Sequence, residues 1–289
     1  MSNALDWARD GADWPNRTAS RFVQAGGFSW HVQVAGQGPV LLLLHGTGAS
    51  THSWRDVLGL LARDFTVVAP DLPGHGFTAT PGGSMMSLPG MARGVAALVR
   101  ALGMVPEIAV GHSAGAAILA RMVIDGLIAP RLLVSLNGAI LPLPSMPAEI
   151  FSPLARALVS LPLLPRLAAW QAGRENAVER LLQGTGSTLD ARGVALYRRL
   201  VSSPGHVAGA LAMMAQWNLR ELARDLPRLV LPVVQIVGSG DRTIPPADAQ
   251  RLCRMLPDAR VISLSGLGHL AHEEAPAETV RLIREAALG

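Results

Sequence analysis

The sequence predicts an α/β protein with a mostly parallel central sheet and an all-helical insertion. Short, continuously apolar runs alternate with helical segments, which is typical of strands buried on both faces of a parallel sheet. This alternation stops between residues 139 and 232, where prolines divide the first part into short pieces and no strand is evident. The 289 residues, 49% hydrophobic and 16% charged, suffice for a large core and exclude global disorder.

The elements of the core follow one another in a regular order. Two alternating runs around Gly26-Gly27 predict an antiparallel hairpin at the start of the sheet. Apolar runs predict buried strands at residues 40–44, 66–69, 108–110, 132–136, 233–237 and 260–264. Helical periodicity predicts helices at residues 53–63, with Ser53 as the N-cap, and at 87–102, 114–124, 247–255 and 276–287.

We expect residues 139–232 to form a helical cap, inserted between the two parts of the core at residues 1–138 and 233–289. Helical periodicity in the cap predicts helices at residues 175–182, 189–201 and 204–217. The cap is apolar and also basic, because it holds 10 arginines against six acids, whereas the rest of the chain holds 15 of each. An apolar cover that carries positive charge is therefore predicted over the sheet.

Composition excludes several classes of function. Every one of the 25 basic residues is arginine, which excludes a lysine Schiff base. The net charge of +4 and the lack of an arginine-rich run disfavour nucleic-acid binding. Cys253 is the only cysteine and the histidines lack metal-ligand spacing, so we expect no disulfide, metal or cofactor. The polar N-terminus and the absence of a long apolar run predict a cytoplasmic protein without a spanning helix.

The segment Gly111-His-Ser-Ala-Gly115 fits the G-x-S-x-G pattern of a nucleophilic serine at a sharp strand-to-helix turn. Small residues on both sides of Ser113 let the strand and the helix approach, and the helix N-terminus stabilises negative charge. The pattern alone is weak in a chain so rich in glycine and serine. Its place between a buried strand and an apolar helix favours a nucleophile over an ordinary turn.

A serine nucleophile needs a base, and the base needs an acid that orients it. His269 lies in a glycine-rich loop after the last predicted strand, where its side chain can reach over the strand ends. His206 lies in the cap, and we expect His272 to be solvated or to support His269. Asp241 follows a buried strand at the sheet edge where α/β sites form, whereas the competing position holds the uncharged Asn137.

The backbone N–H groups of Thr47 and Ala114 are the expected oxyanion donors, one after the first buried strand and one after the nucleophile. We interpret His45, Asp71 and His75 as structural residues of the neighbouring loops. The candidate substrate-binding residues are His112, Met146, Phe151, Met213, Met214 and Trp217. The alternative for most of these side chains is a plain cap core.

The motifs HGTG, DLPGHG, GHSAG, GSGDRTIPP and GLGHLAHEEAP occur in the order of the α/β-hydrolase superfamily, which the chain resembles over most of its length. The resemblance implies the α/β-hydrolase fold, a cap after the sixth strand, and a triad of Ser113, Asp241 and His269. Serine at the elbow speaks against the dehalogenases and epoxide hydrolases of this superfamily, which use a carboxylate nucleophile.

Longer segments are similar to the α/β-hydrolases of bacteriochlorophyll gene clusters, which are described as magnesium-chelatase accessory proteins. WARDGADWPN, HGTGASTHSWRD and LLQGTGSTLDARGVALYRRLVSSPGHVAGALAMMAQW carry this resemblance. It implies a role in photosynthetic tetrapyrrole metabolism, with a magnesium-chelatase subunit as one candidate partner.

Together these features predict a serine hydrolase acting on an ester of a hydrophobic substrate. An anionic tetrapyrrole or an anionic membrane surface would complement the cap arginines at positions 198, 199, 220, 224 and 228, and solvated helix faces are the alternative. Two other functions stay open. One is a non-catalytic porphyrin-binding accessory protein, and the other is a C–C bond hydrolase with the same triad.

Overall fold

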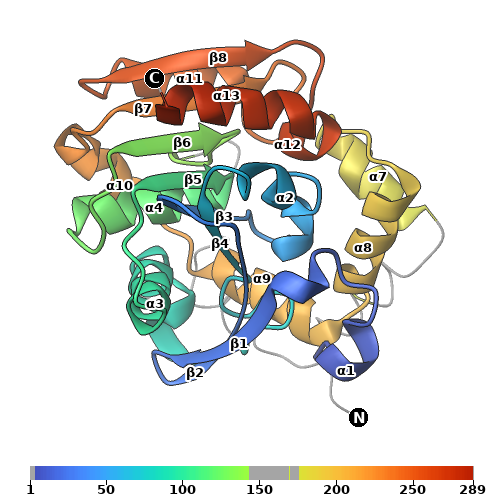
Figure 1. Ribbon diagram of the computed structural model, residues 1–289. Coiled ribbons are helices and arrows are strands. Elements are labelled where there is room, and N and C mark those ends of the chain that lie inside the picture. Colours follow the sequence, from blue (N-terminus) through green and yellow to red (C-terminus); the bar gives the residue numbers. More distant parts are fainter. Residues whose placement is uncertain (1–3, 143–168, 170–175, 289) are drawn as a thin grey trace.

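The computed structural model describes residues 4–142, 169 and 176–288, and its centre is one eight-stranded sheet (Figure 1). The strand order is β1-β2-β4-β3-β5-β6-β7-β8. The pairs β1–β2 and β2–β4 are antiparallel and all the other pairs are parallel. The strands are β1 (Ser20–Ala25), β2 (Phe28–Ala35), β3 (Val40–Leu44), β4 (Thr66–Pro70), β5 (Ile108–His112), β6 (Leu132–Leu136), β7 (Val233–Gly238) and β8 (Ala259–Leu264). The predicted fold class is confirmed.

Helices cover both faces of the sheet, because neighbouring strand residues point to opposite sides. Leu42 and Leu44 of β3 join one apolar cluster, and Leu41 and Leu43 join the other. The first cluster includes α3 (Leu88–Ala101), α4 (Ala114–Ile124) and α11 (Pro246–Cys253); the second includes α2 (Leu58–Leu61), α12 (Ala271–Glu274) and α13 (Pro276–Leu288). This double cover explains why the parallel strands are apolar throughout.

The helix predicted at residues 53–63 is present only at residues 58–61. The structure has a 3₁₀ turn, η2 (Thr51–Trp54), followed by the short α2, and the N-cap of η2 is Ser50. All four residues of η2 are buried, so this segment is not an amphipathic surface helix. The Ser53 hydroxyl does not cap a helix, because it bonds to His272 and Glu273 instead.

Helices form the described part of the chain between β6 and β7. They are α7 (Ala177–Gly184), α8 (Ala191–Val201), α9 (Pro204–Ala215), α10 (Arg220–Asp225) and the 3₁₀ turn η5 (Leu226–Arg228). The first three match the predicted cap helices to within a few residues, and α10 was not predicted. Because Arg121 of α4 binds Asp225 at 2.8 Å, α10 packs on the core. The division at residues 138 and 233 stays a prediction.

The N-terminal segment adds α1 (Trp7–Asp10) and η1 (Arg17–Ala19), and η3 (Gly83–Met86) precedes α3. Within the described ranges, no helix has the length and apolarity that crossing a bilayer requires.

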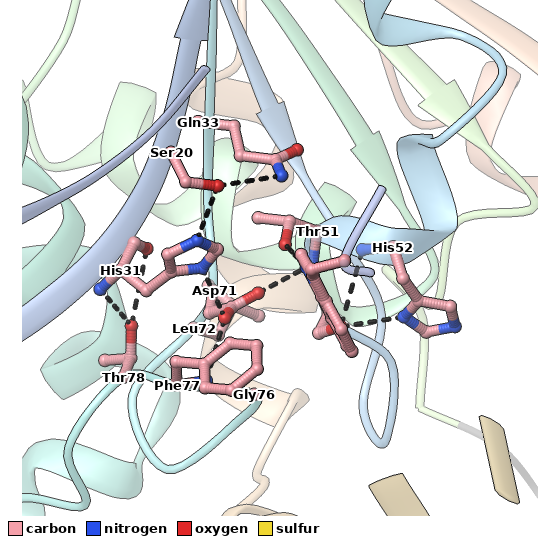
Figure 2. A network of polar contacts seen from close by, with 12 residues as sticks. Ser20, His31, Gln33, Thr51, His52, Asp71, Leu72, Gly76, Phe77 and Thr78 are labelled. Atoms are coloured by element: carbon pink, nitrogen blue, oxygen red, sulfur yellow. Dashed lines mark hydrogen bonds and ion pairs between the residues drawn. The ribbon is translucent and has the colours of Figure 1, made fainter. Parts of the chain in front are cut away.

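Asp71 anchors three separate segments to one another (Figure 2). Its buried carboxylate accepts hydrogen bonds from the backbone N–H groups of Thr51 (2.7 Å) and Phe77 (2.9 Å) and contacts His31 Nδ1 at 2.8 Å. Burial by itself raises the pKa of Asp71, but the charge and hydrogen bond of His31 outweigh it and leave the pKa below its usual value. Asp71 therefore fixes the loops that lead into the site described next.

Candidate active site

Ser113 lies at a sharp turn between β5 and α4, with φ 51° and ψ −118°. Positive φ is a strained conformation for a residue with a side chain, and such strain gathers at functional sites. A Cβ at Gly111 would lie 2.5 Å from the Ala116 backbone nitrogen, and one at Gly115 would overlap the Leu44 carbonyl oxygen. The glycines of the motif are therefore required by the close approach of strand and helix.

Asp241 and His269 lie together, because Asp241 Oδ2 is 2.8 Å from His269 Nδ1 and both side chains are buried. Asp241 Oδ1 accepts hydrogen bonds from the backbone N–H groups of Thr243 (2.7 Å) and Ile244 (2.9 Å). Asn137 Nδ2 donates to Asp241 Oδ2 at 2.7 Å. Asn137, at the position that competed with Asp241 for the role of the acid, thus holds the Asp241 carboxylate by a hydrogen bond.

A cavity of about 500 Å³ brings Ser113 and His269 together, although no hydrogen bond joins their side chains. Thr47 and Ala114, the expected oxyanion donors, also line it. The described lining contains no Asp, Glu or Arg side chain. Its apolar members include Ala139, Leu181, Leu182, Val201, Val207, Ala210, Leu211, Met214, Trp217, Ile244 and Leu270.

The candidate substrate-binding residues separate into three groups. His112, Met214 and Trp217 line the cavity. Met213 does not: it is fully buried in the core, where its sulfur accepts a hydrogen bond from Thr47 Oγ1 at 3.5 Å. Because adjacent positions on α9 point to different sides of the helix, Met214 faces the cavity while Met213 faces the core. Met146 and Phe151, also predicted to bind substrate, lie outside the described residues.

Residues 41–282 match the family model described as the alpha/beta hydrolase family. The chain belongs to this family. It is 39% identical over 266 residues to the magnesium-chelatase 30 kDa subunit of Rhodobacter capsulatus, which covers 91% of this chain and 93% of that protein. It is 30% identical to a fluoroacetate dehalogenase of a Burkholderia species, over 92% of each chain. A crystal structure of an alpha/beta hydrolase fold protein from Burkholderia ambifaria superposes with a TM-score of 0.78 at 24% identity, covering 99% of this chain and 100% of that one.

His112 of this α/β-hydrolase holds the backbone of the loop that carries His269. Its Nε2 donates to the His269 carbonyl oxygen at 2.9 Å, and its ring centroid lies 4.4 Å from that of His272. Burial, together with the neighbouring His272 and His269, lowers the pKa of His112 well below its usual value. His112 therefore stays neutral at physiological pH.

His272 is buried, so the first of its two expected roles, that of a solvated residue, is wrong. It contacts Ser53 Oγ at 2.8 Å, and Ser53 donates to Glu273 Oε1 at 2.6 Å. The same carboxylate accepts from the Tyr197 hydroxyl at 2.7 Å and forms an ion pair with Arg55. Burial raises the pKa of Glu273, and the Arg55 charge opposes this shift. The cluster ties α8 of the predicted cap to the core directly after His269.

His206 is a cavity residue that sequence reasoning left without a role. Its Nδ1 accepts from the Gly76 N–H and its Nε2 donates to the Gly48 carbonyl oxygen, both at 3.1 Å. Burial lowers the pKa of His206 to about 4, so the ring is neutral at physiological pH. The partners lie 130 and 158 residues away, so no local signal in the sequence could have found them. Across the described ranges, no group of three potential ligands could hold a metal ion.

Proposed function

We propose that this α/β-hydrolase is a serine hydrolase that cleaves an ester of a hydrophobic substrate, with Ser113, His269 and Asp241 as its catalytic triad. One observation carries the proposal: His269, which is hydrogen-bonded to Asp241, lines the same cavity as the strained elbow serine. The three residue types have the roles that nucleophilic acyl transfer requires.

In the proposed mechanism, the Ser113 hydroxyl attacks the ester carbonyl carbon while His269 Nε2 accepts its proton. The Asp241 carboxylate holds the Nδ1–H of the ring and stabilises the positive charge that forms. The Thr47 and Ala114 N–H groups bind the oxyanion, and removing one such donor costs about 100- to 1,000-fold in rate. The ester C–O bond then breaks, and His269 returns the proton to the leaving alcohol. Water repeats the sequence on the acyl-enzyme and releases the acid.

The cavity favours an uncharged apolar group beside the scissile bond. Its described lining has no acidic or basic side chain except histidine, and burial lowers the pKa of His112 and His206 so that both stay neutral. A carboxylate placed there would lose its hydration without gaining a cationic partner. We therefore propose a neutral ester as the group that enters.

The five cap arginines add no positive charge to the cavity. None of the five lines the cavity. Arg198 pairs with Glu179 at 2.5 Å, Arg199 pairs with Asp13 at 2.7 Å, and Arg228 donates to a core carbonyl oxygen. Any carboxylates of a tetrapyrrole substrate would therefore remain outside the cavity while one esterified arm enters.

We propose tetrapyrrole esters of bacteriochlorophyll biosynthesis as the substrate class to test first. The support is the similarity to the magnesium-chelatase 30 kDa subunit over nearly the whole length of both proteins. The same name favours a second candidate function, that of a porphyrin-binding accessory protein of magnesium chelatase in which catalysis is not needed.

Fluorophosphonate labelling followed by intact-mass measurement tests the nucleophile. We expect one adduct on the wild type and none on Ser113→Ala, with Ser202→Ala as a control that labels like the wild type. A folded wild type that takes no adduct would refute the hydrolase, as would an adduct that persists in Ser113→Ala.

Restoration of the biological role separates the two candidates. If Ser113→Ala restores bacteriochlorophyll formation in a strain that lacks the protein, the accessory function is correct. If only the wild type restores it, catalysis is required. Product analysis then distinguishes ester cleavage, which releases an alcohol, from C–C bond cleavage by the same triad.

A further inference from the structure

A short segment between α7 and α8 contacts both loops of the predicted triad. We call residues 185–188 the strap. The Thr185 carbonyl oxygen accepts two hydrogen bonds, from the Arg242 N–H at 3.1 Å and from the His269 N–H at 3.3 Å. A single oxygen atom of the strap thus joins the residue after Asp241 to the residue that would act as the base.

The other strap residues extend this attachment. The Ser187 hydroxyl, fully buried, accepts from the Leu270 N–H at 2.8 Å. The Thr188 N–H donates to Glu274 Oε2 at 3.2 Å, and Glu274 Oε1 accepts from the Gly268 N–H at 2.9 Å. Hydrogen bonds therefore hold the His269 loop to the strap before, at and after His269.

Glycines let the three backbones touch directly. Gly186 has φ +84°, and a Cβ built on it would overlap the Gly240 carbonyl oxygen. A Cβ on Gly268 would overlap the backbone of Gly186 and the Ser187 hydroxyl. The Asp241 and His269 loops are also joined directly, by the Gly240 N–H and the Leu267 carbonyl oxygen at 2.8 Å. The strap therefore contacts both loops at backbone level, at Gly240 and at Gly268.

The strap also belongs to the wall of the cavity. Thr185 lines it, and so do Leu181 and Leu182 on α7 and Tyr197 on α8. A ligand that presses on these helices therefore pushes on the segment that sets the spacing of the two loops. Misplacing a catalytic group by about 1 Å can cost about 100-fold in rate.

Resting on the triad proposed above, we infer that the strap is a positioning element of the active site, with Gly186 and Ser187 as its positioning residues. They touch neither substrate nor reacting atoms, and they act through Asp241 and His269. The catalytic pair is thereby assembled by the cap segment as well as by the core.

Steady-state kinetics with a neutral aryl ester test the inference, using Ser187→Ala and the matched control Thr188→Ala. Ser187→Ala removes the acceptor for Leu270, so we expect kcat to fall about 10- to 100-fold while KM changes less than about twofold. Thr188 contributes only its backbone N–H to the strap, so its variant should match the wild type. Fluorophosphonate labelling should slow by the same factor as kcat.

A folded Ser187→Ala variant with wild-type kcat would overturn the inference, and so would an equal loss in the control. If Ser187→Ala does not fold, Glu274→Gln replaces it, because it removes one of two acceptors and should lower kcat while unfolding near the wild-type urea midpoint. An unchanged kcat in that variant would also overturn the inference. Failure of the proposed function looks different, since the wild type itself would then not label.

Discussion

Mild acid should destabilise this protein strongly through its buried neutral histidines. Burial lowers the pKa of His52, His75 and His112 well below the usual value, that of His206 to about 4 and that of His272 to about 3. In the unfolded chain, a histidine side chain has a pKa of about 6.5. Between that pH and about 4, the unfolded chain binds protons that the folded chain does not, so stability falls as the pH falls.

The size of the effect follows from linkage. From about pH 7.5 to about pH 5.5, each histidine that stays neutral in the fold costs about 1.4 kcal/mol of unfolding free energy. Five such groups give about 7 kcal/mol, which is comparable to the about 5–15 kcal/mol total stability of a typical domain. Acid should therefore unfold the protein well before the ordinary carboxylates titrate.

Urea unfolding at the two pH values measures this loss. His206→Gln is the matched variant, since an amide can donate to Gly48 and accept from Gly76 without titrating. The wild type should lose about 1.4 kcal/mol more than this variant over the same interval. A total loss below about 2 kcal/mol, or equal slopes for wild type and variant, would refute the reasoning.

Three further predictions concern single substitutions. Glu273→Gln should cost about 1–3 kcal/mol in urea unfolding, because it takes the nearest carboxylate from the buried Arg55 guanidinium and leaves only Asp56 and Asp190 to pair with it. Glu278→Gln, in a solvated pair with Arg281, should unfold near the wild-type urea midpoint, and equal losses would contradict the buried cluster. Gly115→Ala should give little folded protein, while Gly59→Ala, in open space on α2, should raise stability by about 0.5–1 kcal/mol, as thermal melts would show. Asp241→Asn should lower kcat about 10⁴-fold at unchanged fold, and a loss below about tenfold would exclude it as the orienting acid.

The strands and most core helices were predictable because they depend on local periodicity. A segment that is apolar on every side must be buried on every side. This holds for the strand at residues 40–44 and for the helix after Ser113, and it does not depend on which elements cover them. Local periodicity was misleading in the segment at residues 53–63. Its apolar spacing is helical, but its polar residues bind partners about 220 positions away and interrupt the helix.

Local sequence patterns were enough to predict the sheet, the elbow and a short list of triad candidates, because strand period, glycine spacing and strand-end loops are properties of neighbouring residues. Which of these groups meet depends on contacts between distant segments. They place Asn137 on Asp241, His272 against Ser53, Met213 in the core and the strap against the loops of Asp241 and His269. These contacts join residues many tens of positions apart, and their energy comes from burial and hydrogen bonding between segments that no local pattern records.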